Sequence, residues 1–138
     1  MFLLDTNVLS EMMRDKPSPA VAAWVSGQAI DTLFTASVCQ AEGLAGIALM
    51  PEGRRQFALE TLATEMFRED FDGRVLPFDS DAAVAYAVIL AASQRAGRPV
   101  ATADMMIAAI ARSRGANVVT RNVRDFQACG VAIINPWA

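Results

Sequence analysis

The sequence predicts a three-layer α/β/α domain, in which helices cover both faces of a mostly parallel sheet of four to five strands. Three observations lead to this expectation. Apolar stretches of four or five residues alternate with helical segments, and no hairpin turn signal joins consecutive strands before the end of the chain. The length of 138 residues suits one core, so residues 1–138 are expected to form a single domain.

Hydrophobic periodicity and end signals place the elements of the first half. In order, these are a strand at 2–4, helices at 7–14 and 19–27, a strand at 32–36, a helix at 37–50 and an amphipathic surface helix at 54–71. Pro17 and Pro19 separate the first two helices. Ser37 with Gln40 three positions later has the form of a capping box, which predicts that the third helix begins there.

The second half continues the alternation. Its expected elements are a strand at 74–78, helices at 82–95 and 102–114, and strands at 117–120 and 131–134. Asp79 or Ser80 is suited to cap the first of these helices, while Gly97 and Pro99 end it. Gly115 stands just past the end of the second.

Composition limits the chemistry that the chain can perform. There is no histidine, which excludes Ser-His-Asp triads, Cys-His pairs and paired-histidine ribonuclease chemistry. Cys39 and Cys129 are isolated, so a thiolate metal site is excluded, and both are expected to be reduced, buried small residues. Neither a secretory signal nor a bilayer-spanning segment is evident, so the sequence predicts a soluble cytoplasmic protein.

Charge is unevenly distributed along the chain. The net charge is −3, yet residues 95–138 hold six arginines against two aspartates, a net of +4. Arginine presents a planar fork that suits phosphate groups. The asymmetry fits a local anionic partner, and it fits solvated helix faces equally well.

Four acidic residues lie near the ends of predicted strands or in the first turns of predicted helices. Asp5 follows the first strand and Asp125 follows the strand that ends at Thr120, whereas Glu42 and Asp104 lie in early helical turns. Ligands of open α/β sheets bind at the carboxyl ends of the strands. The four acids are therefore expected to converge at one edge of the sheet.

Each acid also has a purely structural interpretation. Asp104 and Asp125 suit a helix cap, where the dipole stabilises an acid by about 0.3 to 1 kcal/mol. That interpretation is weaker for Asp5, at a strand exit, and for Glu42, which a helical wheel places beside the apolar positions Val38, Ala45 and Leu49. A carboxylate at a core-facing edge is costly unless something pairs with it.

Carboxylates without imidazole or thiolate groups select a hard ion, Mg²⁺ or Mn²⁺. Such an ion lowers the pKa of bound water, polarises a phosphoryl oxygen and offsets the charge by which four acids would repel RNA. Hydrolysis of a phosphodiester bond by metal-activated water is the reaction that fits these residues.

The chain resembles the PIN-domain endoribonucleases, and most closely the VapC-type toxins of bacterial toxin-antitoxin pairs. The resemblance covers essentially the whole chain. It is carried, in order, by Leu4-Asp5-Thr6-Asn7-Val8-Leu9-Ser10-Glu11, Ala41-Glu42, Leu76-Pro77-Phe78-Asp79, Ala103-Asp104 with Ile107-Ala108-Ala109, Thr120-Arg121-Asn122 with Asp125-Phe126, and Asn135-Pro136-Trp137. It implies a PIN-like fold and an Mg²⁺- or Mn²⁺-dependent ribonuclease that cuts single-stranded RNA.

The resemblance also implies roles for individual residues. Asp5, Glu42 and Asp104 correspond to the metal ligands of the family. A fourth acid often follows Thr-Arg directly, where this chain has Asn122, and here the acid comes three positions later, at Asp125. Whether Asp125 touches a metal, positions water or orders the loop stays open, as does the number of metal ions.

Other residues receive supporting roles. Thr6, Asn7, Thr120 and Asn122 are expected to orient the ligands, although each of them also suits a turn or a cap. Arg121 and Arg124 are the candidates for binding RNA. This resemblance and the excess of basic residues near the C-terminus suggest them.

The implied partners are RNA, a second copy of the chain and a VapB-type antitoxin whose tail covers the site, with no membrane involved. Met12, Met13 and Trp24 either line a groove for such a segment or, as is more common, pack in the core. Phe78, Tyr86 and Trp137 are expected to pack rather than to stack on bases. The sequence names neither the RNA target nor the antitoxin.

Two other functions compete with a nuclease. A catalytically silent PIN-type scaffold would bind RNA or protein without cutting, and the retained acids speak against it. A haloacid-type phosphatase requires Asp-x-Asp after the first strand, where this chain has Asp5-Thr6-Asn7, and a receiver domain requires a second acid beside Asp5.

Overall fold

The computed structural model describes residues 1–138 and contains one five-stranded sheet in which every pair of neighbouring strands is parallel. The strands are β1 (Phe2–Leu4), β2 (Leu33–Ala36), β3 (Val75–Leu76), β4 (Asn117–Val119) and β5 (Ile133–Ile134). Their spatial order is β3-β2-β1-β4-β5. Because β1 is central, its carboxyl end lies between those of β2 and β4, where the chain order reverses.

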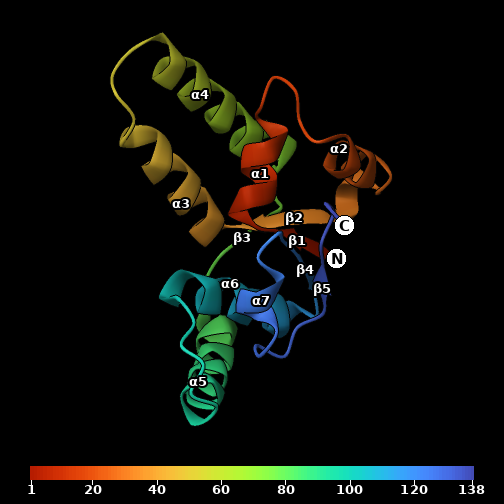
Figure 1. Cartoon of the computed structure of the whole chain (residues 1–138), viewed down its shortest axis with the longest axis vertical. Helices are drawn as coiled ribbons and strands as arrows, with labels where there is room; N and C mark the ends of the chain where they lie inside the picture. Colours follow the sequence, from red (N-terminus) through yellow and green to blue (C-terminus); the bar gives the residue numbers. More distant parts are fainter.

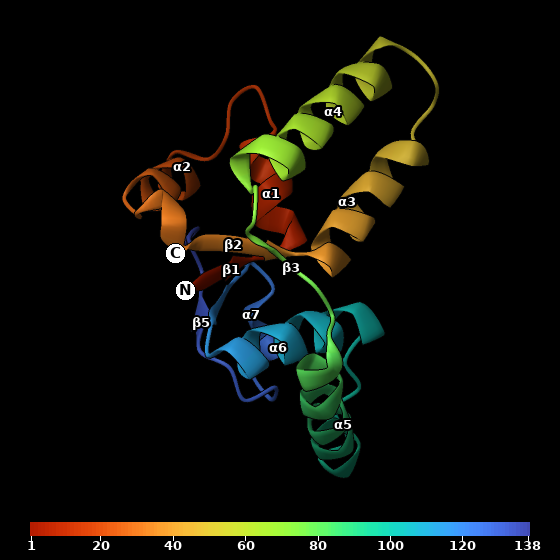
Figure 2. The ribbon, with the colours of Figure 1, turned by 180° about the vertical axis from the view of Figure 1, so that it is seen from behind.

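Helices cover both faces of the sheet, so the expected three-layer α/β/α architecture is confirmed. They are α1 (Thr6–Met12), α2 (Pro19–Ser26), α3 (Ser37–Ala48), α4 (Arg54–Glu65), α5 (Ser80–Arg95), α6 (Thr102–Arg114) and α7 (Val123–Phe126). Figures 1 and 2 show α1 to α4 on one side of the strands and α5 to α7 on the other. Helices α3 and α4 project together as an antiparallel arm. None of the helices is long and apolar enough to cross a bilayer.

Several boundaries agree with expectation for identifiable reasons. Asp79 accepts a hydrogen bond from the Ala82 N–H (3.0 Å) and caps α5. Gly115 ends α6 at a φ of 67°, a conformation that glycine adopts without the steric cost paid by other residues. Helix α6 begins and ends at the expected residues, and its apolar stretch from Ile107 to Ala111 is buried.

Other expectations were wrong in detail. The predicted capping box does not form, since Ala36 occupies the N-cap of α3 and no side chain caps it. The strands predicted at 74–78 and 131–134 shorten to two residues each, because they lie at the two edges of the sheet. The helix predicted at 54–71 changes to a π-helix at Met66–Asp70, and a 3₁₀ turn at Ile30–Thr32 precedes β2.

Arg74 ties this irregular region together. Its guanidinium donates hydrogen bonds to the carbonyl oxygens of Ile30, Leu33 and Asp70, and it lies over the ring of Phe71 at 5.5 Å. The carbonyls belong to the 3₁₀ turn, to β2 and to the π-helix. One side chain therefore fastens the end of the α4 arm to the amino end of β2.

Candidate functional site at the carboxyl edge of the sheet

Asp5 is the best-defined member of the predicted acid cluster. It follows β1 directly, is 3% exposed, and its backbone N–H donates to the Val119 carbonyl on β4 (2.9 Å). Its Oδ1 accepts a hydrogen bond from the Thr6 N–H (2.8 Å), so Asp5 caps α1. Its Oδ2 accepts from the Thr120 hydroxyl (2.7 Å) and from Asn7 Nδ2 (3.2 Å). Burial raises the pKa of Asp5 above its ordinary value, although these hydrogen bonds act in the opposite direction.

Thr120 connects the ends of the two central strands. Its hydroxyl is fully buried, donates to Asp5, and accepts from Asn7 Nδ2 (3.2 Å) and from the Asn122 N–H (3.0 Å). Asn7 also accepts from the Arg121 N–H through its Oδ1 (3.2 Å). The structure thus places the predicted supporting residues around Asp5, with Asn122 contributing through its backbone.

Glu42 reaches the site from α3 and not from the core. Its Oε1 accepts a hydrogen bond from the Thr6 hydroxyl (2.8 Å). The expectation that it lies on a core-facing edge was wrong: Glu42 and Ala45 are exposed, and Leu49 is 86% exposed. The buried residues of α3 are Cys39 and Ile47, because α3 stands in the projecting arm and only one narrow face meets the domain.

Asp104 lies in the first turn of α6 on the opposite side of the sheet. Partial burial, together with the negative charges of Asp5, Asp125 and Glu42, raises its pKa to about 6, and burial contributes most. The four acids therefore stand close enough to repel one another, as the order of the strands predicted. After β4, the acid whose charge reaches Asp104 is Asp125, which lies in α7.

The residues at this edge fit a hard cation held mainly through water. No three acidic or cysteine side chains lie close enough together to hold one ion directly. Mg²⁺ usually keeps several waters and binds through one or two carboxylates, so a loose acidic cluster suits it better than a tight one. Asp5 accepts three hydrogen bonds and retains one free lone pair, on Oδ1, and Asp104 carries an unfavourable charge that a cation would relieve.

The thiols near the acids remain neutral. Cys39 and Cys129 are both free and buried, as the sequence predicted. Burial, with the negative charge of Asp5, raises the pKa of Cys39 to about 12. Burial likewise raises the pKa of Cys129. Neither thiol offers a thiolate ligand at neutral pH.

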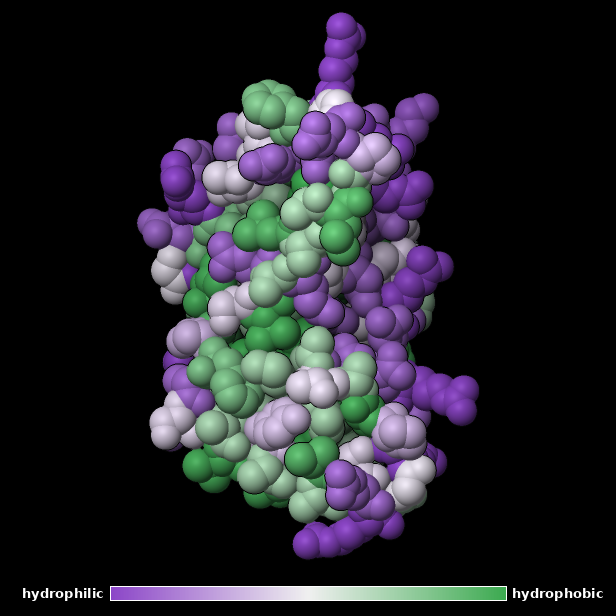
Figure 3. Space-filling view, turned by 90° about the vertical axis from the view of Figure 1, so that its left-hand side faces the viewer, coloured by the Kyte–Doolittle hydropathy of each residue, from purple (hydrophilic) through white to green (hydrophobic).

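A groove of about 870 Å³ opens beside the acid cluster, between α1, α3 and α4. It extends from Thr6 and Glu42 to Met50 and Leu62, and basic side chains line part of it. Figure 3 shows apolar side chains over both the upper and the lower half of the side of the molecule that it views. The groove begins at Thr6 and Glu42, so a segment lying in it would also meet Glu42 at the margin of the site.

Sequence reasoning found only part of this groove. Met13 lines it, but Met12 and Trp24 pack against the core, and Trp24 meets the ring of Phe2 edge-on at 5.2 Å. Gly43 and Gly46 form the open side of α3, and a Cβ built on either would meet nothing within 4 Å. Two glycines three residues apart in a helix were the signal that could have located this surface.

The PIN-domain model matches residues 2–130. The chain belongs to the PIN-domain family. The plasmid stability protein StbB of Pseudomonas syringae pv. tomato is 47% identical over 99% of both chains. The VapC ribonuclease Y4jK of Sinorhizobium fredii is 41% identical, with 99% of this chain and 98% of the relative covered.

Two further comparisons place this PIN domain among toxins. Toxin FitB of Neisseria gonorrhoeae is 36% identical over 99% of both chains. The structure of FitAB bound to the IR36 DNA fragment superimposes with a TM-score of 0.93 at 36% identity, covering 100% of this chain and 96% of the other. The resemblance to VapC-type proteins drawn from the sequence is thereby confirmed.

Proposed function

We propose that this PIN domain, spanning residues 1–138, is a metal-dependent endoribonuclease toxin that acts on single-stranded RNA in the cytoplasm and is neutralised by a cognate VapB-type antitoxin. The observation that carries the proposal is the convergence of Asp5, Glu42, Asp104 and Asp125, from four separate elements, on one edge of the sheet. Relatives named as a VapC ribonuclease and as a toxin support the same assignment.

Asp5, Glu42 and Asp104 are the residues that would hold Mg²⁺ or Mn²⁺, mainly through water molecules bound to the ion. When bound, the ion supplies Lewis-acid activation of water and compensates the charge of the phosphate. Thr120, Asn7 and the Thr6 N–H fix the orientation of the Asp5 carboxylate. The Thr6 hydroxyl fixes one oxygen of Glu42.

Asp125 is suited to orient water and accept its proton. Its carboxylate is exposed, and its charge is felt at Asp104. The backbone of the loop is held by hydrogen bonds from Asn122 N–H to Thr120 and from Asp125 N–H to the Asn122 carbonyl (3.1 Å). Because these hydrogen bonds fix the loop backbone, Asp125 can accept a proton from water without a change in the position of its backbone.

The test is cleavage of labelled single-stranded RNA by the purified chain. We expect activity with Mg²⁺ or Mn²⁺, loss of activity with a chelator, and recovery when Mn²⁺ is added back. Asp5→Asn and Asp104→Asn should each abolish cleavage and growth inhibition. Full activity in both variants would refute the nuclease assignment, and RNA binding without cleavage by the unmodified chain would favour a silent scaffold. Mapping RNA ends after brief expression would identify the target.

The antitoxin is expected to occupy the groove beside Glu42. Gly46→Trp places a large side chain in the open space of that groove, whereas Gly46→Ala adds only a methyl group. We expect the tryptophan variant to remain toxic when the neighbouring antitoxin gene is co-expressed, and the alanine variant to be neutralised. Neutralisation of both variants would contradict this location.

Self-association into a homodimer has a suitable surface on α5. Val84 and Val88 are 68% and 50% exposed, one helical turn apart on the same face. Apolar side chains gather over the lower half of the molecule in Figure 3, where α5 and α6 lie. Val88→Glu should convert a dimer to a monomer in light scattering, and an unchanged mass would refute this interface.

A further inference from the structure

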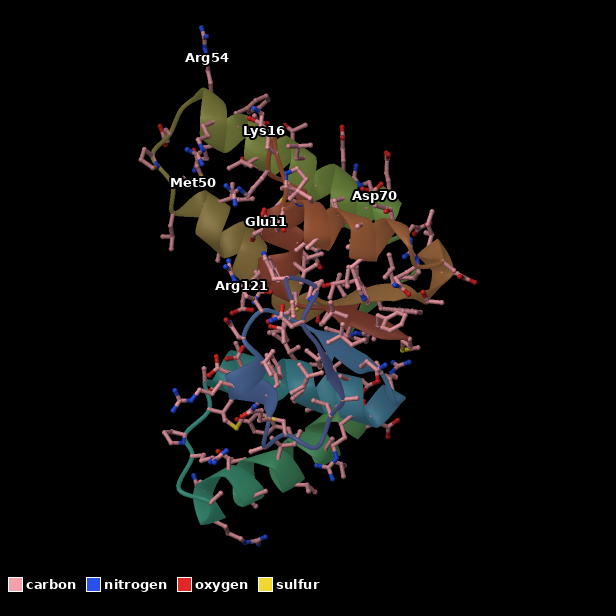
Figure 4. The ribbon with its side chains drawn as sticks, turned by 45° about the vertical axis from the view of Figure 1, so that its right-hand side comes forward. Glu11, Lys16, Met50, Arg54, Asp70 and Arg121 are labelled. Atoms are coloured by element: carbon pink, nitrogen blue, oxygen red, sulfur yellow. The ribbon has the colours of Figure 1, made fainter.

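Strand pairing brings two distant segments together next to the acid cluster. Strands β4 and β5 run parallel with Val119 opposite Ile134. Arg121 follows the end of β4 by two residues, and Trp137 follows the end of β5 by three. Both residues therefore emerge at the carboxyl edge that holds the acids. Figure 4 shows Arg121 at the waist of the molecule, between the two helical layers.

The backbone of Arg121 is fixed relative to Asp5. Its N–H donates to Asn7 Oδ1 (3.2 Å), and Asn7 Nδ2 donates to Asp5 Oδ2 (3.2 Å). One asparagine thus spans the two residues. The start of the arginine side chain has a defined position beside the reacting edge.

The Arg121 side chain is held by an aromatic ring and not by an acid. Its guanidinium carbon lies 5.1 Å from the centroid of the Trp137 ring. The guanidinium makes no hydrogen bond or ion pair within the chain, although four carboxylates lie at the same edge. All five of its N–H donors are free for an external acceptor.

Trp137 is itself held in place by its own turn. The Asn135 side chain accepts from the Trp137 N–H (3.0 Å), and the Asn135 carbonyl accepts from the Ala138 N–H (3.2 Å). The ring is half-buried and packs against the core. The sequence predicted only this packing role, yet the other side of the ring supports an arginine.

We propose that Arg121 binds a phosphate of the RNA backbone next to the acid cluster, and that Trp137 is the positioning residue that holds its guanidinium there. The inference rests on the proposed ribonuclease function. A guanidinium held over a ring leaves its fork of N–H donors free for the bidentate contact that a phosphate favours. The ring also keeps the arginine from collapsing onto the acids, where it would compete with a cation.

The experiment measures KM and kcat for cleavage of a fluorescein-labelled single-stranded RNA at several salt concentrations. Arg121→Ala should raise KM about tenfold, as expected for one lost charge-assisted phosphate contact, with kcat changed less than twofold. The slope of log(kcat/KM) against log[salt] should become shallower by about 0.7, the contribution of one phosphate contact on a single strand. Arg54→Ala is the matched control, since Arg54 lies at the far end of the α4 arm in Figure 4.

Variants of Trp137 separate positioning from packing. Trp137→Leu preserves apolar bulk and should raise KM about threefold, whereas Trp137→Phe preserves a ring face and should restore KM. In the double variant with Arg121→Ala, Trp137→Leu should add nothing, because the ring acts through the arginine. Melting temperatures of all variants report any general loss of structure.

An unchanged KM in Arg121→Ala, a tenfold loss confined to kcat, or additive effects in the double variant would each overturn the inference while leaving the ribonuclease function intact. The same loss in Arg54→Ala would also overturn it, since it would show a general effect of charge. If the unmodified chain cleaves no RNA with any divalent ion, the proposed function fails and this inference fails with it.

Discussion

Asp104→Asn should make the metal-free protein more stable while removing its activity. Asparagine has nearly the shape of aspartate, so the change removes charge without opening a cavity. The Asp104 carboxylate is partly buried and is repelled by Asp5, Asp125 and Glu42, which together raise its pKa from the ordinary value of 3.8 to about 6. The folded chain therefore carries an ionised group that it accommodates poorly at neutral pH.

The size of the effect follows from this pKa. At about 1.4 kcal/mol per pKa unit, ionising Asp104 in the folded state costs at most about 3 kcal/mol. Asp104 is partly exposed, so solvent screening reduces this figure, and the helix dipole of α6 offsets part of the rest. We expect Asp104→Asn to raise the free energy of unfolding by about 1 kcal/mol at pH 8 in a chelator, or the melting temperature by roughly 3 °C.

The effect should depend on pH in a definite direction. Because the folded-state pKa of Asp104 lies above its value of 3.8 in the unfolded chain, ionisation destabilises the folded state above pH 6, and lowering the pH through 6 toward 3.8 relieves that cost. The stability difference between the two proteins should therefore be largest near pH 8 and approach zero near pH 4. Urea unfolding in the absence of divalent ions, repeated across this range, measures it.

Asp81→Asn provides the matched control. Asp81 also lies in the first turn of a helix, α5, but it is exposed and stands outside the acid cluster. Its loss should weaken the protein slightly, by a few tenths of a kcal/mol, through the helix dipole alone. If Asp104→Asn proved as destabilising as Asp81→Asn at pH 8, Asp104 would be an ordinary helix-terminal acid and the argument for a strained cation site would fall.

Three further predictions concern the surroundings of the site. Thr120→Val keeps the shape of the buried side chain but removes the hydroxyl that bonds both Asp5 and Asn7. The rate of RNA cleavage should fall about 10- to 100-fold. An unchanged rate would show that Asp5 does not need this hydrogen bond. Glu11→Ala should lower the free energy of unfolding in urea by about 2 kcal/mol, because this buried acid accepts hydrogen bonds from Arg14 and from a backbone N–H. Arg14→Ala, at an exposed position, should lower it by under 1 kcal/mol. Equal losses would contradict this difference. Gly46→Ala should add about 0.5 to 1 kcal/mol to the free energy of unfolding in urea, because a Cβ there meets nothing within 4 Å; an unchanged or lower stability would contradict this.

The position of the acids at the sheet edge was predictable because it depends on the order of the strands and not on individual side-chain contacts. Asp5 follows a central strand, and the strand before Thr120 pairs beside it, so their meeting follows from parallel topology alone. Likewise, the position of Asp104 at the start of a helix follows from the apolar run that comes directly after it in the sequence. These features are local in sequence and tolerate errors of one or two residues in the boundaries.

Glu42 shows where such reasoning stops. A helical wheel ranks faces by hydrophobicity and assumes that the most apolar face is buried, but α3 belongs to an arm whose apolar side partly borders an open groove. The wheel therefore assigned Leu49 to the core although it is 86% exposed. The stacking of Arg121 on Trp137 was equally inaccessible, since it depends on the geometry of two turns after neighbouring strands. Surfaces kept open for a partner contradict the rule that apolar residues lie inside.

The arrangement of the arginines leaves the acids at the sheet edge without a basic partner in the chain. Arg14 pairs with Glu11, Arg114 pairs with Asp79 at 3.2 Å, and Arg74 donates its hydrogen bonds to backbone carbonyl oxygens. Arg121, at the same edge as the acids, is held by an aromatic ring instead. No basic side chain of the chain forms an ion pair with the cluster, so the repulsion that raises the pKa of Asp104 is left for something outside the chain to relieve. Either an ion with its RNA phosphate or a cationic side chain of an antitoxin tail would relieve that repulsion, and competition between the two for the uncompensated acids would make the site both active and controllable.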